Sequence, residues 1–197
     1  QPAVDGMRHE GCPFVGCLYA GLMITPNGIK VLEFNARFGD PETQCVMPLI
    51  DCDFFELLRA CADGCLNSNL LRIKENTSCV SVVLASGGYP NKYSTGYEIS
   101  GVQKAMSVPS TYVFHAGTKL VKGNNVIAAN QSGKKAAADK YETSGGRVLA
   151  VSACASTMKE ARARVSHAVR SIHFIDCFHR TDIAGKMLSA SDVQAMQ

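Results

Sequence analysis

Residues 31–44, VLEFNARFGDPETQ, place a glutamate and an asparagine two positions apart at the end of an apolar run. The apolar run CLYAGLMI at residues 17–24 precedes IKVLEFN at residues 29–35, and the turn formers of TPNG join them, which predicts a β-hairpin. Side chains two apart in a strand share a face. We therefore expect Glu33 and Asn35 on one face, with Cα atoms about 6.5–7 Å apart.

This pair suits a metal ion, because carboxylate and amide oxygens are the donors that a hard cation prefers. Two such ligands are a sparse set, which fits Mg²⁺ that keeps waters and takes further ligands from a substrate's phosphates. Arg37 adds a planar fork of donors for phosphate or carboxylate, and Gly39 lets the backbone approach a ligand closely. The alternative is a solvated Glu33, a turn-forming Asn35 and an Arg37 in a surface ion pair.

The composition limits the class of protein. With 197 residues, 46% hydrophobic and 19% charged, the chain is globular and long enough for one core, or for a domain plus part of another. Its net charge of +3 comes without a basic stripe, so nucleic-acid binding has no support. No apolar run approaches the roughly 20 residues of a membrane helix. Nine cysteines without a Cys-x-x-Cys pair fit a reducing, cytoplasmic compartment.

Periodicity predicts an α+β fold. Asp40 is expected to cap a helix that begins at Pro41, and Thr157 with Glu160 forms a capping box for a helix to residue 172. The further expected elements are a helix at 53–65 and strands at 78–85, 112–120 and 147–155. Residues 121–143 are polar without a sustained period and are interpreted as an exposed insertion.

Two weaker candidates lie in the later strands. A Gly-Gly turn precedes Arg147 and would let this side chain and backbone N–H groups approach a phosphate, although a plain turn is the alternative. His115 and Lys119, four apart in the expected strand 112–120, would share a face and could line the same cleft. Structural roles for both residues stay open.

Several motifs together resemble glycinamide ribonucleotide synthetase, the phosphoribosylamine–glycine ligase family of ATP-grasp enzymes in purine biosynthesis. VLEFNARFGDPETQ, with LYAGLM before it, is similar to that family's last catalytic strand and loop. The likeness covers nearly the whole chain in order, with residues 121–143 as the main departure. The later matching segments are VVLASGGYP (82–90), GYEISG (96–101), VFHAGTKL (113–120), SGGRVLAV (144–151) and IHF to HRTDIA (172–184).

The resemblance implies roles for individual residues. Glu33 and Asn35 match the family's Mg²⁺ or Mn²⁺ ligands, and Arg37 and Asp40 match the loop beside the phosphates and substrate. Gly39 and Arg147 complete the candidate phosphate-binding set, and Arg37 is the candidate for stabilising charge in the transition state. The implied reaction joins glycine to 5-phosphoribosylamine through glycyl phosphate, with ATP as co-substrate and no protein nucleophile, so positioning and electrostatics supply the catalysis.

The resemblance also implies that the chain is part of a longer protein. Residues 1–66 match the end of an ATP-grasp core and residues 67–190 a C-terminal domain, with the insertion at 121–143. The chain starts at Gln1 without a leader, and the lobes that would hold adenine are expected upstream, so we expect the chain alone to be inactive. Two alternatives stay open: a non-catalytic module that binds a phosphate ligand or a partner, and an ATP-grasp ligase for another carboxylate.

Overall fold

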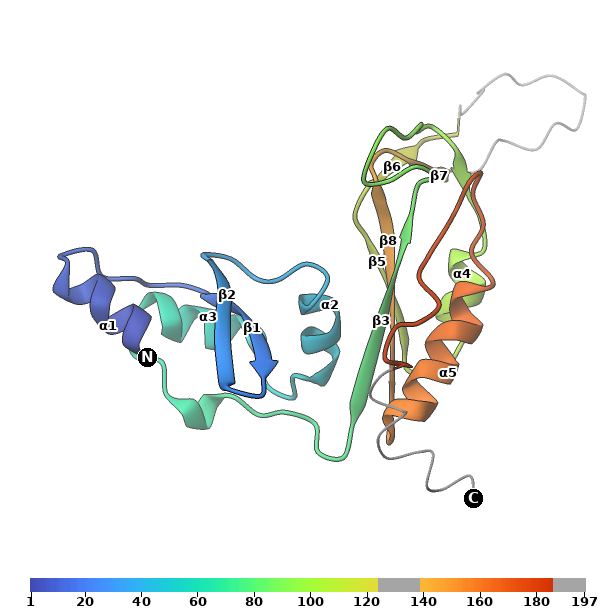
Figure 1. Cartoon of the computed structure of the whole chain (residues 1–197). Coiled ribbons are helices and arrows are strands. Elements are labelled where there is room, and N and C mark those ends of the chain that lie inside the picture. The colour runs from blue at the N-terminus through green and yellow to red at the C-terminus, as the bar shows by residue number, and fades with distance from the viewer. Residues whose placement is uncertain (124–138, 186–197) are drawn as a thin grey trace, which may run out of the picture. The chain divides into compact units, whose positions relative to one another are not determined.

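The structure is a computed structural model that describes residues 1–123 and 139–185 (Figure 1). The chain divides into two compact units between Glu75 and Asn76. Helices accompany antiparallel strands in both units, which confirms the predicted α+β class. None of the helices in the described residues has the length and apolarity that crossing a bilayer requires.

Unit 1 is built around the predicted hairpin. Its turn is Pro26-Asn27, followed by Gly28 at φ +94°, a conformation that glycine adopts without strain. Gly21 faces Glu33 and Leu22 faces Val31, so Leu32 is the extra residue of a β-bulge. In chain order the elements are α1 (Pro2–His9), β1 (Tyr19–Thr25), β2 (Gly28–Asn35), α2 (Thr43–Val46), η1 (Met47–Leu49), α3 (Phe54–Ala62) and η2 (Ser68–Leu70).

The predicted helix at 53–65 is confirmed as α3, with both of its ends capped. The Asp53 carboxylate accepts from the backbone N–H groups of Phe55 and Glu56 at 2.9 and 3.2 Å. At the other end Gly64 takes φ +69°, and the Cys65 N–H donates to the Ala60 carbonyl at 2.9 Å. This arrangement is a Schellman motif, and it ends the helix before residue 65.

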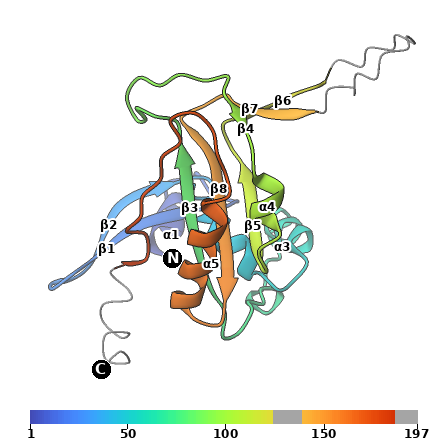
Figure 2. The same cartoon turned by 90° about the vertical axis from the view of Figure 1, so that its right-hand side faces the viewer.

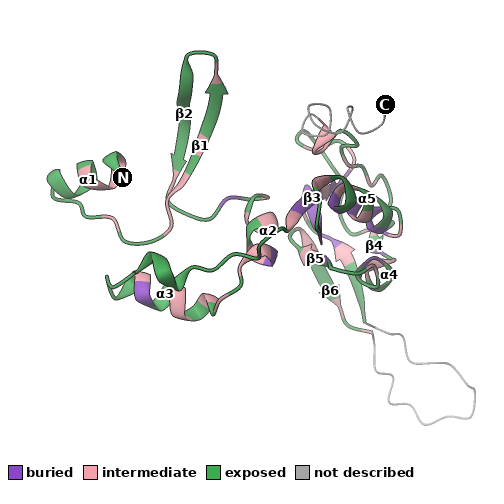
Figure 3. Ribbon diagram, turned by 90° about the horizontal axis from the view of Figure 1, so that it is seen from below, coloured by how far each residue is buried: buried purple, intermediate pink, exposed green. Residues whose placement is uncertain are grey.

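Unit 1 has almost no core of its own. Only Gly39, Pro48 and Ala60 are buried within residues 1–75, and Figure 3 draws most of the hairpin in the exposed colour and the rest as intermediate. Ile24 is 86% exposed and Ile29 67% exposed. A two-stranded hairpin that covers neither face is marginally stable by itself, so this unit needs further packing partners.

Unit 2 contains two three-stranded antiparallel sheets. The order β3-β8-β5 forms the larger sheet, and the order β4-β7-β6 forms the smaller one. The predicted strands at 78–85 and 147–155 are confirmed as β3 and β8. The elements are β3 (Ser78–Ala85), β4 (Glu98–Ile99), α4 (Val102–Met106), β5 (Thr111–His115), β6 (Thr118–Val121), β7 (Lys140–Thr143), β8 (Arg147–Ala155) and α5 (Met158–Val169).

The core of unit 2 lies between the larger sheet and α5, which runs across β3 and β8 (Figure 2). α5 presents Ala161, Val165, Ala168 and Val169 to this core. Its start confirms the predicted N-cap, because the Thr157 hydroxyl accepts from the Glu160 N–H at 3.2 Å. In a capping box the Glu160 carboxylate would accept from the Thr157 N–H. Here it accepts from the Ser156 hydroxyl at 2.7 Å instead.

The prediction of one strand over residues 112–120 is wrong. The chain turns at Ala116 and Gly117, so His115 ends β5 in one sheet while Lys119 lies in β6 of the other. A Cβ on Gly117 would lie 2.6 Å from the Arg147 carbonyl oxygen and 2.8 Å from Gly145 Cα. This close approach of distant backbone breaks the strand, so the two side chains do not share one strand face.

The predicted insertion at residues 121–143 lies mostly outside the described residues. Its ends are described, and they belong to the smaller sheet. Val121 pairs with Lys140 as β6 and β7 begin their antiparallel ladder, which continues to Thr118 and Thr143.

The nine cysteines all lie in the described residues and form no disulfide there. Cys79 and Cys154 are buried opposite each other in β3 and β8, where thiols pack as small apolar groups. Burial raises the pKa of the Cys177 thiol to about 11. This thiol is therefore protonated and weakly reactive at neutral pH.

Leu149→Ala tests the core of unit 2. Leu149 is fully buried in β8, so the change is expected to lower the free energy of unfolding by about 2–5 kcal/mol. Leu120→Ala is the control, because Leu120 is 46% exposed. This change should lower the free energy of unfolding by no more than about 0.5 kcal/mol. Urea titration followed by circular dichroism measures both, and equal losses would contradict the assignment of the core.

Gly117→Ala tests the contact that breaks the strand. The new methyl group would meet backbone atoms that cannot turn aside, so we expect a loss of about 1–3 kcal/mol in the free energy of unfolding. Gly6→Ala is the control, because a Cβ at this position in α1 meets nothing within 4 Å. If urea titration shows no decrease in the free energy of unfolding of Gly117→Ala, the turn can move to accommodate a side chain and the contact does not break the strand.

Candidate metal and phosphate site

The end of β2 joins three of the predicted site residues by hydrogen bonds. The Asn35 amide donates from Nδ2 to Glu33 Oε1 at 3.0 Å, so the two side chains share a face as predicted. Arg37 donates from Nη1 to the Phe38 carbonyl at 2.8 Å, and its Nη2 lies 3.5 Å from Asn35 Oδ1, at the limit of a hydrogen bond. The three residues therefore form a continuous polar chain where β2 ends.

The opposite strand leaves room for this chain. Gly21 of β1 faces Glu33, and a Cβ there would lie 3.0 Å from Glu33 Cγ. Tyr19 faces Asn35 across the hairpin. A glycine opposite the carboxylate thus lets the Glu33 side chain lie over β1 without a clash.

Tyr19 is a part of this site that the sequence reasoning missed. Its hydroxyl donates to the Glu42 carboxylate, and partial burial together with that carboxylate raises the pKa of Tyr19 above its usual value. Its ring also lies 3.1 Å from where a Gly39 Cβ would be. The hairpin register alone, which pairs Tyr19 with Asn35, could have identified it.

Gly39 is buried, and it links the loop to α2. Its carbonyl accepts from the Thr43 hydroxyl at 2.5 Å and from the Thr43 N–H at 3.2 Å. A side chain at this position would press on Glu42, whose Cβ would lie 3.0 Å away, as well as on Tyr19. The lack of a side chain therefore lets the loop pack closely after Arg37.

The prediction that Asp40 caps a helix is wrong. The helix α2 begins at Thr43, and its N-cap is Glu42, which makes no side-chain cap bond. Asp40 Oδ1 accepts instead from the Gln44 amide at 3.0 Å. The Asp40-Pro41 peptide is cis, and these two residues form the turn before the helix.

Gln44 carries an orphaned acceptor beside Asp40. Its Oε1 atom is buried and has no hydrogen-bond partner in the part of the chain that the structure describes. An unpaired buried acceptor costs about 1–3 kcal/mol. The position is thus suited to a donor from outside unit 1.

Arg147, the other predicted phosphate-binding residue, belongs to unit 2. It begins β8 directly after the Gly145-Gly146 turn. Ser86, another residue that the sequence reasoning missed, holds that turn: its hydroxyl donates to the Gly145 carbonyl at 2.9 Å and its N–H to the Gly146 carbonyl at 2.8 Å. The Arg147 carbonyl also accepts from the Gly117 N–H at 2.8 Å. Hydrogen bonds therefore hold the backbone both before Arg147 and at Arg147 itself.

The geometry provides a partial set of metal ligands. Glu33 and Asn35 bring a carboxylate and an amide together, which suits a hard cation that draws its other ligands elsewhere. No group of three or more His, Cys, Asp or Glu side chains within residues 1–123 and 139–185 could hold a metal ion. The two residues fit Mg²⁺ or Mn²⁺ only as part of a larger coordination shell.

Family comparisons match both units. The family described as phosphoribosylglycinamide synthetase, C domain, matches residues 79–186, and the one described as phosphoribosylglycinamide synthetase, ATP-grasp (A) domain, matches residues 1–43. The phosphoribosylamine–glycine ligase of Streptomyces coelicolor is 43% identical over 193 residues, which is 96% of this chain and 42% of that protein. A bifunctional purine biosynthetic protein of Schizosaccharomyces pombe is 42% identical over 96% of this chain and 22% of its own length.

A solved structure agrees with these relatives. The crystal structure of phosphoribosylamine–glycine ligase from Thermotoga maritima matches with a TM-score of 0.67 and 30% identity, over 90% of this chain and 39% of that one. This chain spans less than half the length of each of these three proteins. On the C-domain match, which covers more than half of its residues, the chain belongs to the phosphoribosylglycinamide synthetase family.

Proposed function

We propose that the chain is part of a polypeptide that ligates glycine to 5-phosphoribosylamine, with ATP converted to ADP and phosphate. The hydrogen-bonded series Glu33, Asn35 and Arg37 at the end of β2 carries this proposal. Membership of the family and the names of the relatives support it. Glycine's carboxylate would attack the γ-phosphate of ATP, and the ribosyl amine would then displace phosphate from the glycyl phosphate.

Glu33 and Asn35 would hold Mg²⁺ or Mn²⁺. The metal, when bound, would neutralise charge on the ATP oxygens during transfer. Asn35 gives its Nδ2 group to Glu33 in the structure, and a flip of the amide would offer Oδ1 instead. The hydrogen bond shows that the two side chains are close together, which supports their assignment as ligands of one metal ion.

The remaining site residues would bind phosphate and substrate. Arg37, whose guanidinium donates to the Phe38 carbonyl and lies near Asn35 Oδ1, would turn to an anionic oxygen and stabilise the charge that develops during phosphoryl transfer. Gly39 would allow the loop to approach the ligand, and Asp40 would contact the substrate. Arg147 would add a second guanidinium for phosphate.

The domain arrangement follows the same proposal. Residues 1–66 would complete an ATP-grasp core, and residues 67–190 would form the C-terminal domain, with 121–143 as its insertion. The remaining lobes of the same polypeptide would cover the exposed apolar side chains of β1 and β2 and would supply a donor for Gln44 Oε1. We place the complete protein in the cytoplasm and assign it no nucleic-acid or membrane partner.

An ADP-release assay tests whether the chain acts alone. With glycine, 5-phosphoribosylamine and Mg²⁺–ATP, we expect no glycine-dependent turnover from the 197-residue chain. A polypeptide extended upstream by the missing ATP-grasp lobes should be active, because those lobes would complete the nucleotide site. Turnover in neither protein would favour a non-catalytic module, and turnover in the short chain would refute the need for the lobes.

Glu33→Gln in the extended polypeptide tests the metal assignment. Loss of one charged ligand should raise the Mg²⁺ concentration needed for half-maximal activity at least about tenfold, while circular dichroism stays unchanged. Glu56→Gln is the control, since Glu56 pairs with Arg59 on the surface of α3. If most of the Glu33→Gln protein is insoluble and the soluble remainder keeps the normal Mg²⁺ dependence, Glu33 has a structural role instead.

A further inference from the structure

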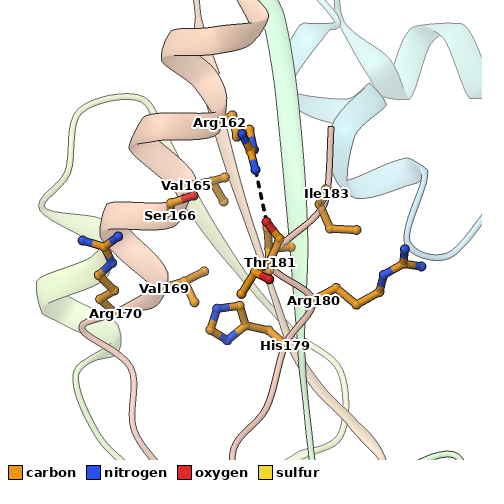
Figure 4. A pocket seen from close by; sticks show the side chains of 10 residues that line it. Arg162, Val165, Ser166, Val169, Arg170, His179, Arg180, Thr181 and Ile183 are labelled. Carbon is orange, nitrogen blue, oxygen red and sulfur yellow. Dashed lines mark hydrogen bonds between the residues drawn. The ribbon is translucent and has the colours of Figure 1, made fainter. Parts of the chain in front are cut away.

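A cavity of about 250 Å³ lies in unit 2 beside α5 (Figure 4). It is bounded by one side of the helix, by Val82 of β3 and by residues 179–183. None of the predicted metal or phosphate residues lines it. The cavity is therefore a separate feature that the proposed ligase function does not use.

The floor of the cavity is apolar, and its rim is cationic. Val82, Val165 and Val169 are buried at its base. Three arginines and His179 line it, and no carboxylate is among its described lining residues. Buried apolar surface beside the charges lowers the local dielectric and strengthens any charge interaction there.

The three arginines differ in how far their charges are already compensated. Arg180 is neutralised by Asp182, with hydrogen bonds of 2.9 and 2.6 Å to the two carboxylate oxygens. Arg162 donates only to a neutral group, the Thr181 carbonyl, at 3.1 Å, as the dashed line in Figure 4 shows. The guanidinium of Arg170, the C-cap residue of α5, makes no hydrogen bond or ion pair within the described residues. Two guanidinium charges at this cavity, those of Arg162 and Arg170, are therefore left without an anionic partner in the described part of the chain.

The positions of these two arginines indicate the shape of the ligand. Arg162, Ser166 and Arg170 recur every four residues, so they form one stripe along α5 that is about 12 Å long between its end Cα atoms. Arginine side chains are long enough to reach inward from both ends of such a stripe. The arrangement suits a molecule with one anionic group near each arginine and its body over the valines.

The volume sets the size of that molecule. A cavity of about 250 Å³ equals the liquid volume of roughly eight waters, which is more than a lone phosphate requires and less than most drug-sized sites offer. We propose that the cavity binds a small organic phosphate that carries a second anionic group. Its phosphate and its second group would each accept hydrogen bonds from one arginine.

Calorimetric titration of the 197-residue chain with 3-phosphoglycerate tests this proposal. We expect saturable binding, weaker binding of glycerol 3-phosphate, which lacks the carboxylate, and the weakest binding of inorganic phosphate. Arg162→Gln and Arg170→Gln should each weaken 3-phosphoglycerate at least about tenfold. In one of the two variants the preference for 3-phosphoglycerate over glycerol 3-phosphate should disappear, because that arginine meets the carboxylate.

Two control variants make the result specific. Arg164→Gln changes the same helix, but Arg164 does not line the cavity. Like Arg162, Arg164 donates to a backbone carbonyl, that of Cys154, at 2.8 Å. Arg147→Gln removes the guanidinium of the proposed ligase site. Both should bind 3-phosphoglycerate as the unchanged chain does. The proposal is overturned by an absence of saturable binding, by inorganic phosphate binding equally well, or by equal weakening in Arg164→Gln. Loss of binding only in Arg147→Gln would assign the ligand to the ligase site instead.

Discussion

Burial of β8 is the constraint on which unit 2 depends. Its residues from Val148 to Ala155 are all buried, while Arg147 at its start is exposed. A central buried strand needs a neighbour along each edge and a layer over its core face; β3 and β5 are the two neighbours, and α5 is the layer. The same requirement orients α5, so that its valines face the sheet and its arginines lie outside the core.

Unit 1 depends on the opposite condition. Its polar side chains are brought together by the two-residue period of β2, with Gly21 leaving space for Glu33, and not by a packed core. Such a site can be arranged by a few residues of local sequence, but the hairpin that carries it exposes apolar side chains such as Ile24 and Ile29. The proposed phosphoryl transfer would require reacting groups to be held within a fraction of an ångström. The rigidity for this would have to come from packing beyond unit 1.

Local features could be predicted from the sequence, and contacts between distant residues could not. The hairpin, β3, β8 and the Thr157 cap follow from side-chain period and from hydrogen bonds within a few residues. The break between β5 and β6 follows from Gly117 meeting the backbone of Gly145 and Arg147, nearly thirty residues later. The same holds for Ser86, which supports the Gly145-Gly146 turn across 59 positions.

Asp40 illustrates how a correct motif can carry a wrong local interpretation. An aspartate before a proline has the composition of a helix start, yet the helix begins three residues later and Asp40 bonds to the Gln44 side chain. The loop is held at Gly39, whose carbonyl binds Thr43 and whose missing side chain accommodates Glu42 and Tyr19. The Gly39 carbonyl accepts from the Thr43 N–H at the start of α2, so this N–H does not need the Asp40 carboxylate as a cap. The Asp40 carboxylate contacts the Gln44 side chain and not the start of α2, so its proposed contact with the substrate can be tested separately from helix stability.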